Sequence, residues 1–321
     1  MRKPVGESDS QRRTGGRIPG SPGSPAFILT GPEPSSIPVL IAVPHAGRGY
    51  TDALVRAMRS PGSSALKLED RYVDRLAAAI AAETGAMLLV AHAPRAMIDL
   101  NRAPDDVDWE MFGRPERGGT SRLPPSRRAR SGLGLIPRRL PGIGELWKRR
   151  HGEDELAARI SQVHEPYHAE LARVLSALRD RWGAALLIDL HSMPPVIPPA
   201  GQTPPDFVIG DRFGDACHGS LVAAAFSYFG EVDCVAAHNR PYAGGYVLER
   251  HSSPARGVHG LQVEIDRCRY LDSRLAEPGR GFGDVVLQLA GLVRRLAPEV
   301  AALGQAGGQD SGGSVWPEAA E

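Results

Sequence analysis

The sequence has few cysteines and no long uninterrupted apolar run. Its three cysteines, Cys217, Cys234 and Cys268, form no CxxC pair and are odd in number, which argues against a disulfide framework and against a cysteine-based zinc site. No stretch of about 18 consecutive apolar residues occurs, so we expect no membrane span. The first residues are basic but no apolar segment follows them, so we expect no secretory signal and a cytoplasmic protein.

The remaining composition is that of a soluble globular protein. Hydrophobic residues make up 42% and charged residues 23% of the 321 residues, which is enough to bury a substantial core. Residues 1–26 and 303–321 are rich in Gly, Ser and Pro or polar residues, so we expect two disordered tails. Residues 27–302 then form one globular domain.

The net charge of +1 conceals an uneven distribution. Residues 1–26 carry +3 and residues 110–150 carry +8, which leaves −10 for the rest of the chain. The basic segment 110–150 has three interpretations: a solvated surface loop, an electrostatic funnel for an anionic substrate, or a nucleic-acid site. It lacks interleaved aromatic residues and any recognisable binding module, so we expect no nucleic-acid partner.

Strand-like and helix-like segments alternate along the chain. We expect helices at 69–86, 154–183 (kinked or split by Pro166), 216–230 and 281–300, and strands at 38–47, 86–94, 184–192, 206–211 and 260–271. Residues 96–102 continue the second strand or form another, and 103–150 form a long irregular insertion. This alternation predicts an α/β fold with a mostly parallel mixed sheet and helices on both faces. Ligands bind such sheets beyond the carboxyl ends of the strands.

Three buried strands of this prediction end in residues suited to metal binding or catalysis. They are His45 after "LIAVP", His191 after "LLID", and Glu264 within "LQVEID". Two histidines and a carboxylate, with one position open for water, are the usual catalytic zinc set, and a carboxylate beside such a water acts as general base and then general acid. The plain alternatives are structural histidines that form hydrogen bonds, and a Glu264 paired with Arg267 or Arg269.

Nine short motifs follow one another in a specific order. They are "VPHAGRGY", "EDRYVDRL", "MIDLNRAPDD", "RSGLGLIPR", "EPYHAEL", "LIDLHSMPP", "VIGDR", "NRPYAGGY" and "HGLQVEIDRCRYLD". Over roughly residues 37–295 the chain resembles the N-formylglutamate amidohydrolase family. The resemblance implies a three-layer α/β/α sandwich of the phosphorylase/hydrolase-like kind, similar to zinc carboxypeptidases and aspartoacylases. It also implies hydrolysis of an N-formyl or related N-acyl amino acid; the best-known activity releases glutamate and formate at the end of histidine degradation.

The same resemblance assigns a metal site with one Zn²⁺ per chain. His45 in "PHAG" and His191 in "DLHS" match the family's metal-binding histidines. In zinc carboxypeptidases a carboxylate ligand lies three residues after the first histidine, but here that position is Arg48. The carboxylate must therefore come from elsewhere. The candidates are Asp70 and Asp74 at the start of the following helix, and we favour Asp70 because it is nearer the loop.

Further roles follow from the resemblance. Glu264 resembles the catalytic glutamate, which takes a proton from water and passes it to the leaving amine. Arg95 is implied as the group that polarises the carbonyl, and Asp189 as the carboxylate that orients a ligand histidine. The residues implied to bind the substrate are Asn101, Arg102, Arg240 and Tyr242. The first three are implied to hold its carboxylates. A turn with a salt bridge is the plain alternative for "IDLNR".

Two rival functions stay open at this point. One is hydrolysis of a different N-acyl amino acid or small peptide on the same fold. The other is a member of the fold without catalysis, which binds an acidic metabolite as a sensor. All of these interpretations have a small molecule as the partner.

Overall fold

An eight-stranded mixed sheet forms the centre of the computed structural model, which describes residues 10–113, 126–198, 201 and 203–309. The strand order is β1-β2-β4-β3-β7-β10-β8-β9. The strands are β1 (Ser10–Gly15), β2 (Phe27–Pro32), β3 (Val39–Val43), β4 (Met87–Ala91), β7 (Ala185–Met193), β8 (Phe207–Gly210), β9 (Ala236–His238) and β10 (Val258–Asp266). The central strands β4, β3, β7 and β10 are parallel, whereas β1, β2 and β8 pair antiparallel with their inner neighbours. The predicted mostly parallel mixed sheet is confirmed.

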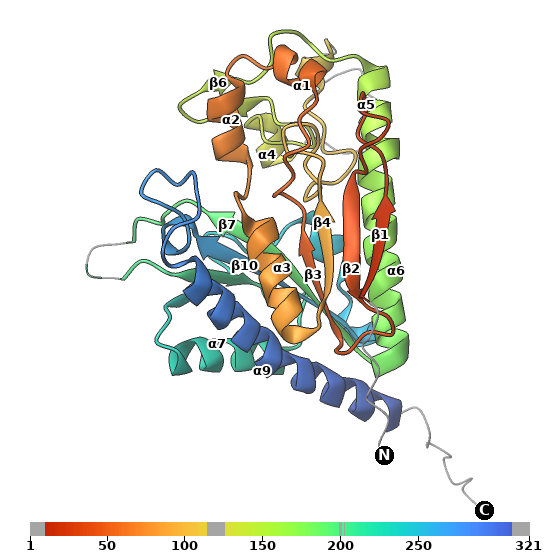
Figure 1. Cartoon of the computed structure of the whole chain (residues 1–321), viewed down its shortest axis with the longest axis vertical. Coiled ribbons are helices and arrows are strands. Elements are labelled where there is room, and N and C mark those ends of the chain that lie inside the picture. The colour runs from red at the N-terminus through yellow and green to blue at the C-terminus, as the bar shows by residue number, and fades with distance from the viewer. Residues whose placement is uncertain (1–9, 114–125, 199–200, 202, 310–321) are drawn as a thin grey trace, which may run out of the picture.

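Helices cover both faces of this sheet (Figure 1). One core contains residues of α3 (Val73–Thr84), α7 (Gly219–Glu231) and α9 (Phe282–Gln309), and the other contains residues of α5 (Glu153–Arg159) and α6 (Glu165–Trp182). Successive side chains of a strand point to opposite faces, so the strands divide their residues between the two cores. The predicted three-layer α/β/α sandwich is confirmed. None of the described helices is long and apolar enough to span a membrane.

The strand β7 explains why an aliphatic run ends in a carboxylate and an imidazole. Leu186, Ile188 and Leu190 enter the core beneath α3, α7 and α9. On the opposite face Ala185 and Leu187 are apolar, and the next positions on that face are Asp189 and His191. The first face therefore stays apolar as far as Leu190 and ends in Ser192, while the other becomes polar from Asp189 onward. Gln262 and Glu264 occupy the corresponding positions of β10, paired with Asp189 and His191 respectively.

The helix predicted at 154–183 is split, as expected. A π-helical turn, Ile160–His164, separates α5 from α6. Pro166 follows this π-helical turn directly, and the carbonyl of Gln162, four residues before it, accepts a hydrogen bond from the N–H of Arg17 instead.

The predicted tails and the predicted strand at 96–102 need correction. In residues 10–26, which composition indicated as disordered, β1 pairs with β2 and Ile18 is buried. The backbone hydrogen bonds that β2 offers do not depend on side-chain hydrophobicity, so composition misses them. At the other end α9 continues to Gln309. Residues 96–102 form turns rather than a strand. Residues 1–9 and 310–321 lie outside the described residues.

Short elements gather at one end of the sheet, near the insertion 103–150 (Figure 1). The insertion is mainly irregular in its described part, as predicted, and residues 114–125 lie outside that part. The remaining short elements of the described residues are α1 (Asp52–Ala57), α2 (Pro61–Leu68), η1 (Trp109–Phe112), α4 (Arg127–Arg130), β5 (Arg139–Leu140), β6 (Gly144–Glu145), α8 (Tyr246–His251), η3 (Pro254–Arg256) and η4 (Arg267–Arg269). None of α1, α2 and α8 was predicted, because each has eight residues or fewer.

Candidate metal centre and active site

Two histidines and an aspartate meet at the carboxyl ends of β3 and β7. His45 lies in the loop after β3, His191 lies on β7, and Asp70 lies in the loop before α3. The Asp70 Oδ2 atom is 2.9 Å from His191 Nδ1 and 3.6 Å from His45 Nδ1. One ligand atom from each residue lies within 4.8 Å of the others. Ligand atoms around a tetrahedral Zn²⁺ are separated by about 3.3 Å, so the three side chains need only small shifts to share one ion.

The hydrogen bonds of both imidazoles fit a metal. His45 Nε2 is 2.7 Å from Asp99 Oδ1, and His191 Nε2 is 2.9 Å from Asp189 Oδ2. Each ring thus uses its outer nitrogen for a carboxylate, as metal-ligating histidines usually do. The inner Nδ1 of His45 is buried and has no hydrogen-bond partner among the described residues. A buried polar atom without a partner is costly, and a bound cation would satisfy it. A donor set of two imidazoles and one carboxylate suits Zn²⁺.

Asp70, not Asp74, is the carboxylate beside the histidines. Tyr72 has a left-handed backbone (φ 59°) and α3 begins at Val73, so Asp70 is on a loop and not on the helix face predicted for it. Its N–H donates to His45 O at 3.0 Å, which holds the loop against the end of β3. Asp74 instead accepts a hydrogen bond from Arg48, 3.1 Å long.

Several groups stabilise the charge of Asp70. Burial opposes this charge, but the hydrogen bond from His191 and the proximity of both imidazoles hold the pKa of Asp70 well below its usual value. Arg267 Nη2 also lies 3.3 Å from Asp70 Oδ1. The alternative in which Glu264 pairs with Arg267 or Arg269 is wrong, because Arg269 pairs with Asp206. No short sequence pattern points to the role of Arg267.

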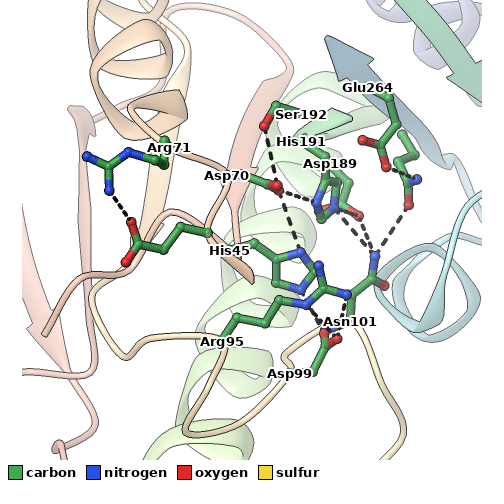
Figure 2. A network of polar contacts seen from close by, with 12 residues as sticks. His45, Asp70, Arg71, Arg95, Asp99, Asn101, Asp189, His191, Ser192 and Glu264 are labelled. Atoms are coloured by element: carbon green, nitrogen blue, oxygen red, sulfur yellow. Dashed lines mark hydrogen bonds and ion pairs between the residues drawn. The ribbon is translucent and has the colours of Figure 1, made fainter. Parts of the chain in front are cut away.

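A chain of amides orients Glu264 next to the metal ligands (Figure 2). Gln262 Nε2 donates to Glu264 Oε1 at 2.9 Å, and Asn101 Nδ2 donates to Gln262 Oε1 at 3.3 Å. The Asn101 Oδ1 atom accepts from the N–H of Val247 in α8, at 2.9 Å. Sequence analysis missed Gln262, although a strand period of two places it on the same face as Glu264.

The carboxyl group of Glu264 has an unusual pKa. Burial raises this pKa, and the nearby charges of Asp70 and Asp189 raise it further, while His191 lowers it; the result is a pKa of about 7. A group with such a pKa changes protonation readily near neutral pH. This is the property expected of a general acid–base residue.

Arg95 and Asp99 form a pair behind His45. Arg95 Nε donates to Asp99 Oδ2 at 2.9 Å, while Asp99 Oδ1 accepts from His45 and from the N–H of Asn101. The turn with a salt bridge, given as the plain alternative for "IDLNR", is therefore present. It also has a function in the site, because Asp99 fixes the ring of His45.

The centre opens into a cavity of about 650 Å³. Its walls include His45, Asp70, Arg95, Asn101, Arg102, His191, Tyr242 and Glu264, so nearly all predicted site residues meet here. Arg240 does not line the cavity and is exposed. Arg102 is half-buried, and its Nε and Nη1 donate to the carbonyls of Leu133 and Asn101. Its Nη2 group has no hydrogen-bond partner among the described residues.

Comparisons with known proteins agree with this site. The family model described as N-formylglutamate amidohydrolase matches residues 37–271. An N-formylglutamate deformylase of Pseudomonas aeruginosa is 29% identical over 279 residues, covering 84% of this chain and 94% of the relative. One from Pseudomonas putida is 31% identical over 239 residues, covering 74% of this chain and 82% of the relative.

Solved structures give the same result. The crystal structure of N-formylglutamate amidohydrolase from Ralstonia eutropha JMP134 has a TM-score of 0.77 and 30% identity, and the match covers 86% of this chain and 99% of that one. An Agrobacterium tumefaciens protein, Atu2144, shares the fold with a TM-score of 0.61 at 17% identity; this match covers 86% of this chain and 95% of that one. The match of the family model over most of the chain, together with these relatives, shows that the chain belongs to the N-formylglutamate amidohydrolase family.

Proposed function

We propose that this protein is a zinc-dependent amidohydrolase that converts N-formyl-L-glutamate into L-glutamate and formate. The observation that carries the proposal is the buried cluster of His45, Asp70 and His191 beside Glu264, at the base of a cavity with cationic walls. The names of the relatives from Pseudomonas and Ralstonia support the choice of substrate.

The three clustered side chains would hold the ion. When bound, Zn²⁺ supplies Lewis-acid chemistry and lowers the pKa of water. The carboxylates of Asp99 and Asp189 keep the two imidazole rings oriented for this role through their Nε2 atoms. Arg267 and Ser192, which contact the Oδ1 atom of Asp70, leave its Oδ2 atom directed at the histidines.

Glu264 moves the proton. It accepts a proton from the water that attacks the formyl carbon, and it then donates this proton to the amine nitrogen as the C–N bond breaks. A pKa of about 7 suits both halves of this cycle. The hydrogen bond from Gln262 holds one carboxylate oxygen, which leaves the other free for the proton transfer.

Arg102 receives one carboxylate of the amino acid. Two of its donors are used by carbonyls, so Nη2 and the remaining N–H of Nη1 form the free edge of the guanidinium. Such an edge binds a carboxylate with two parallel hydrogen bonds. Arg95 stabilises the developing oxyanion from the cavity wall, where Asp99 fixes its position.

The first test measures metal content and amide hydrolysis. We expect the purified protein to bind about one Zn²⁺ per chain and to release free amine from N-formyl-L-glutamate in preference to other N-acyl amino acids. His45→Ala and His191→Ala should lose the metal, as measured by elemental analysis. Asp70→Asn should also bind it poorly, whereas the matched variant Asp74→Asn should keep it, because Asp74 pairs with Arg48 instead.

Two outcomes would contradict the proposal. Full metal occupancy in the double variant of His45 and His191 would show that these histidines are not ligands. Absence of amine release from every N-acyl amino acid by the metal-loaded protein would favour the non-catalytic sensor.

A further inference from the structure

Six basic side chains line the catalytic cavity: Lys67, Arg95, Arg102, Arg128, Arg267 and Arg274. Arg95 and Arg267 each have an aspartate partner, at 2.9 Å and 3.3 Å respectively. Within the part of the chain that the structure describes, neither Arg102 nor Arg128 forms an ion pair. The same holds for Arg274, so the cavity contains three guanidinium groups that have no ion-pair partner among the described residues, in addition to the two neutralised ones.

Arg128 comes from the basic segment 110–150, in which three other described arginines form ion pairs. Arg138 pairs with Asp108, and Arg139 and Arg149 pair with glutamates. These pairs remove much of the positive charge of the segment from its surroundings. Arg128 differs from them, because its side chain faces the cavity without a carboxylate.

The turn of α4 that carries Arg128 is anchored firmly. Ser126 caps it by accepting the N–H groups of Arg128 and Ala129, at 3.2 Å and 3.1 Å. Ser126 in turn donates its hydroxyl and its N–H to Asp106, at 2.9 Å and 3.0 Å. Ala129 is fully buried. The exposed guanidinium of Arg128 therefore extends from a fixed base that is tied to the loop after Arg102.

Arg102 and Arg128 lie together at the boundary between two cavities. A second cavity of about 510 Å³ adjoins the first, and both are lined by Asn101, Arg102, Arg128 and Gly245. Arg127 lines only the second cavity. Burial lowers the pKa of Arg102, and the positive charge of Arg128 contributes to the same shift. Two neighbouring cations that repel each other favour the binding of an anion between or beside them.

We propose that Arg128 is a specificity-determining residue that receives the side-chain carboxylate of a dicarboxylic N-acyl amino acid. This inference rests on the proposed function. The α-carboxylate is attached to the carbon that bears the scissile amide, so it belongs with Arg102, whose neighbour Asn101 contacts His191. The side-chain carboxylate lies farther from the reacting bond, and Arg128 stands at the outer junction of the cavities.

The test compares two substrates that differ only in the second carboxylate. Wild-type protein and Arg128→Gln are assayed with N-formyl-L-glutamate and N-formyl-L-glutamine. We expect Arg128→Gln to lose about 10-fold or more in kcat/KM for the glutamate compound, mainly through KM, and to change little with the glutamine compound. Arg128→Lys should recover part of the loss. Arg127→Gln, one residue away, should behave as wild type with both substrates.

Three kinetic results would overturn the proposal. An equal loss on both substrates would show that Arg128 acts on the reaction or the fold and not on the carboxylate. No loss on either would remove it from substrate recognition. Equal turnover of both substrates by the wild type would show that no receptor for the second carboxylate exists, although the hydrolase activity would stand.

If no turnover is observed, the proposed function fails, but a binding measurement still tests the role of Arg128. Calorimetric titration of the metal-loaded protein should give tighter binding of L-glutamate than of L-glutamine. Arg128→Gln should abolish this difference, and Arg127→Gln should retain it. If Arg128→Gln keeps the full preference for glutamate, the inference is wrong.

Discussion

Substituting Gly245 by alanine should disturb the site through a single methyl group. Gly245 precedes α8 and has φ −112° and ψ −154°, a backbone conformation that alanine adopts without strain. A Cβ atom at this position would lie 2.7 Å from Asn101 Cγ and 2.8 Å from its Nδ2. These distances are far shorter than a van der Waals contact, so the Asn101 amide must move.

Asn101 has little room to do so. It is buried, its Oδ1 caps the Val247 N–H at 2.9 Å, and its Nδ2 faces Gln262 Oε1 at 3.3 Å. Overpacking of this kind costs about 1–3 kcal/mol, and loss of the cap costs about 1 kcal/mol more. We therefore expect Gly245→Ala to lower the free energy of unfolding by about 2–4 kcal/mol. We also expect kcat to fall more than KM changes, because Gln262 would no longer be held in place to orient Glu264.

Urea denaturation and steady-state kinetics test this prediction. Gly219→Ala is the matched control, since a Cβ at that helical position meets nothing within 4 Å; it should be neutral or slightly stabilising. If Gly245→Ala unfolds and turns over like the wild type, Asn101 can relax at no cost. The proposed chain from α8 to Glu264 would then not be rigid.

Three further predictions concern the site and the pH dependence. Glu264→Gln keeps an acceptor for Gln262 but cannot take a proton, so metal content should be unchanged while kcat falls roughly 10²-fold or more; near-normal turnover would contradict the general-base role. Arg102→Lys retains charge but loses the paired donors, so kcat/KM should fall about 10- to 150-fold, and wild-type kinetics would place the α-carboxylate elsewhere. Burial lowers the pKa of His168 well below its usual value and that of His251 to about 3. Both histidines are therefore neutral in the folded state. The free energy of unfolding should be constant above about pH 6.5 and should fall below that pH, by up to about 1.4 kcal/mol per pH unit for each histidine. Urea titrations at pH 7 and pH 5 measure the fall, which should be smaller in His251→Gln.

Sequence patterns predicted the central part of the fold and the two histidines of the site. The aliphatic runs of β3, β7 and β10 are long, and their polar residues follow at positions fixed by a period of two, so His45, His191 and Glu264 could be placed at strand ends. The edge strand β1 was missed, since its pairing depends on backbone hydrogen bonds more than on apolar side chains. The inner strand β2 was missed because its buried apolar run is only three residues long before Thr30 and Gly31.

The supporting residues were harder to predict. Asp70 was identified by resemblance, but its position before α3 depends on the left-handed Tyr72, for which no propensity rule gives a signal. Arg267 reaches Asp70 across 197 positions of the chain, and no local pattern encodes such a contact. The role of Arg128 also requires the fold, since Arg127 and Arg130 lie close to it in the sequence and only the three-dimensional arrangement places Arg128, and neither of these two, against the first cavity.

The wide spacing of the metal-site residues has a consequence for biosynthesis. His45 and Asp70 are translated early, whereas His191 follows Asp70 by 121 residues. At about 5–20 residues per second, a ribosome needs roughly 6–24 s to cover that interval. During this time the nascent chain contains His45 and Asp70 without the third candidate ligand, His191. The complete set of candidate ligands exists only after β7 has left the ribosome and inserted beside β3, so under the proposed function the ion would bind only after these two central strands have paired.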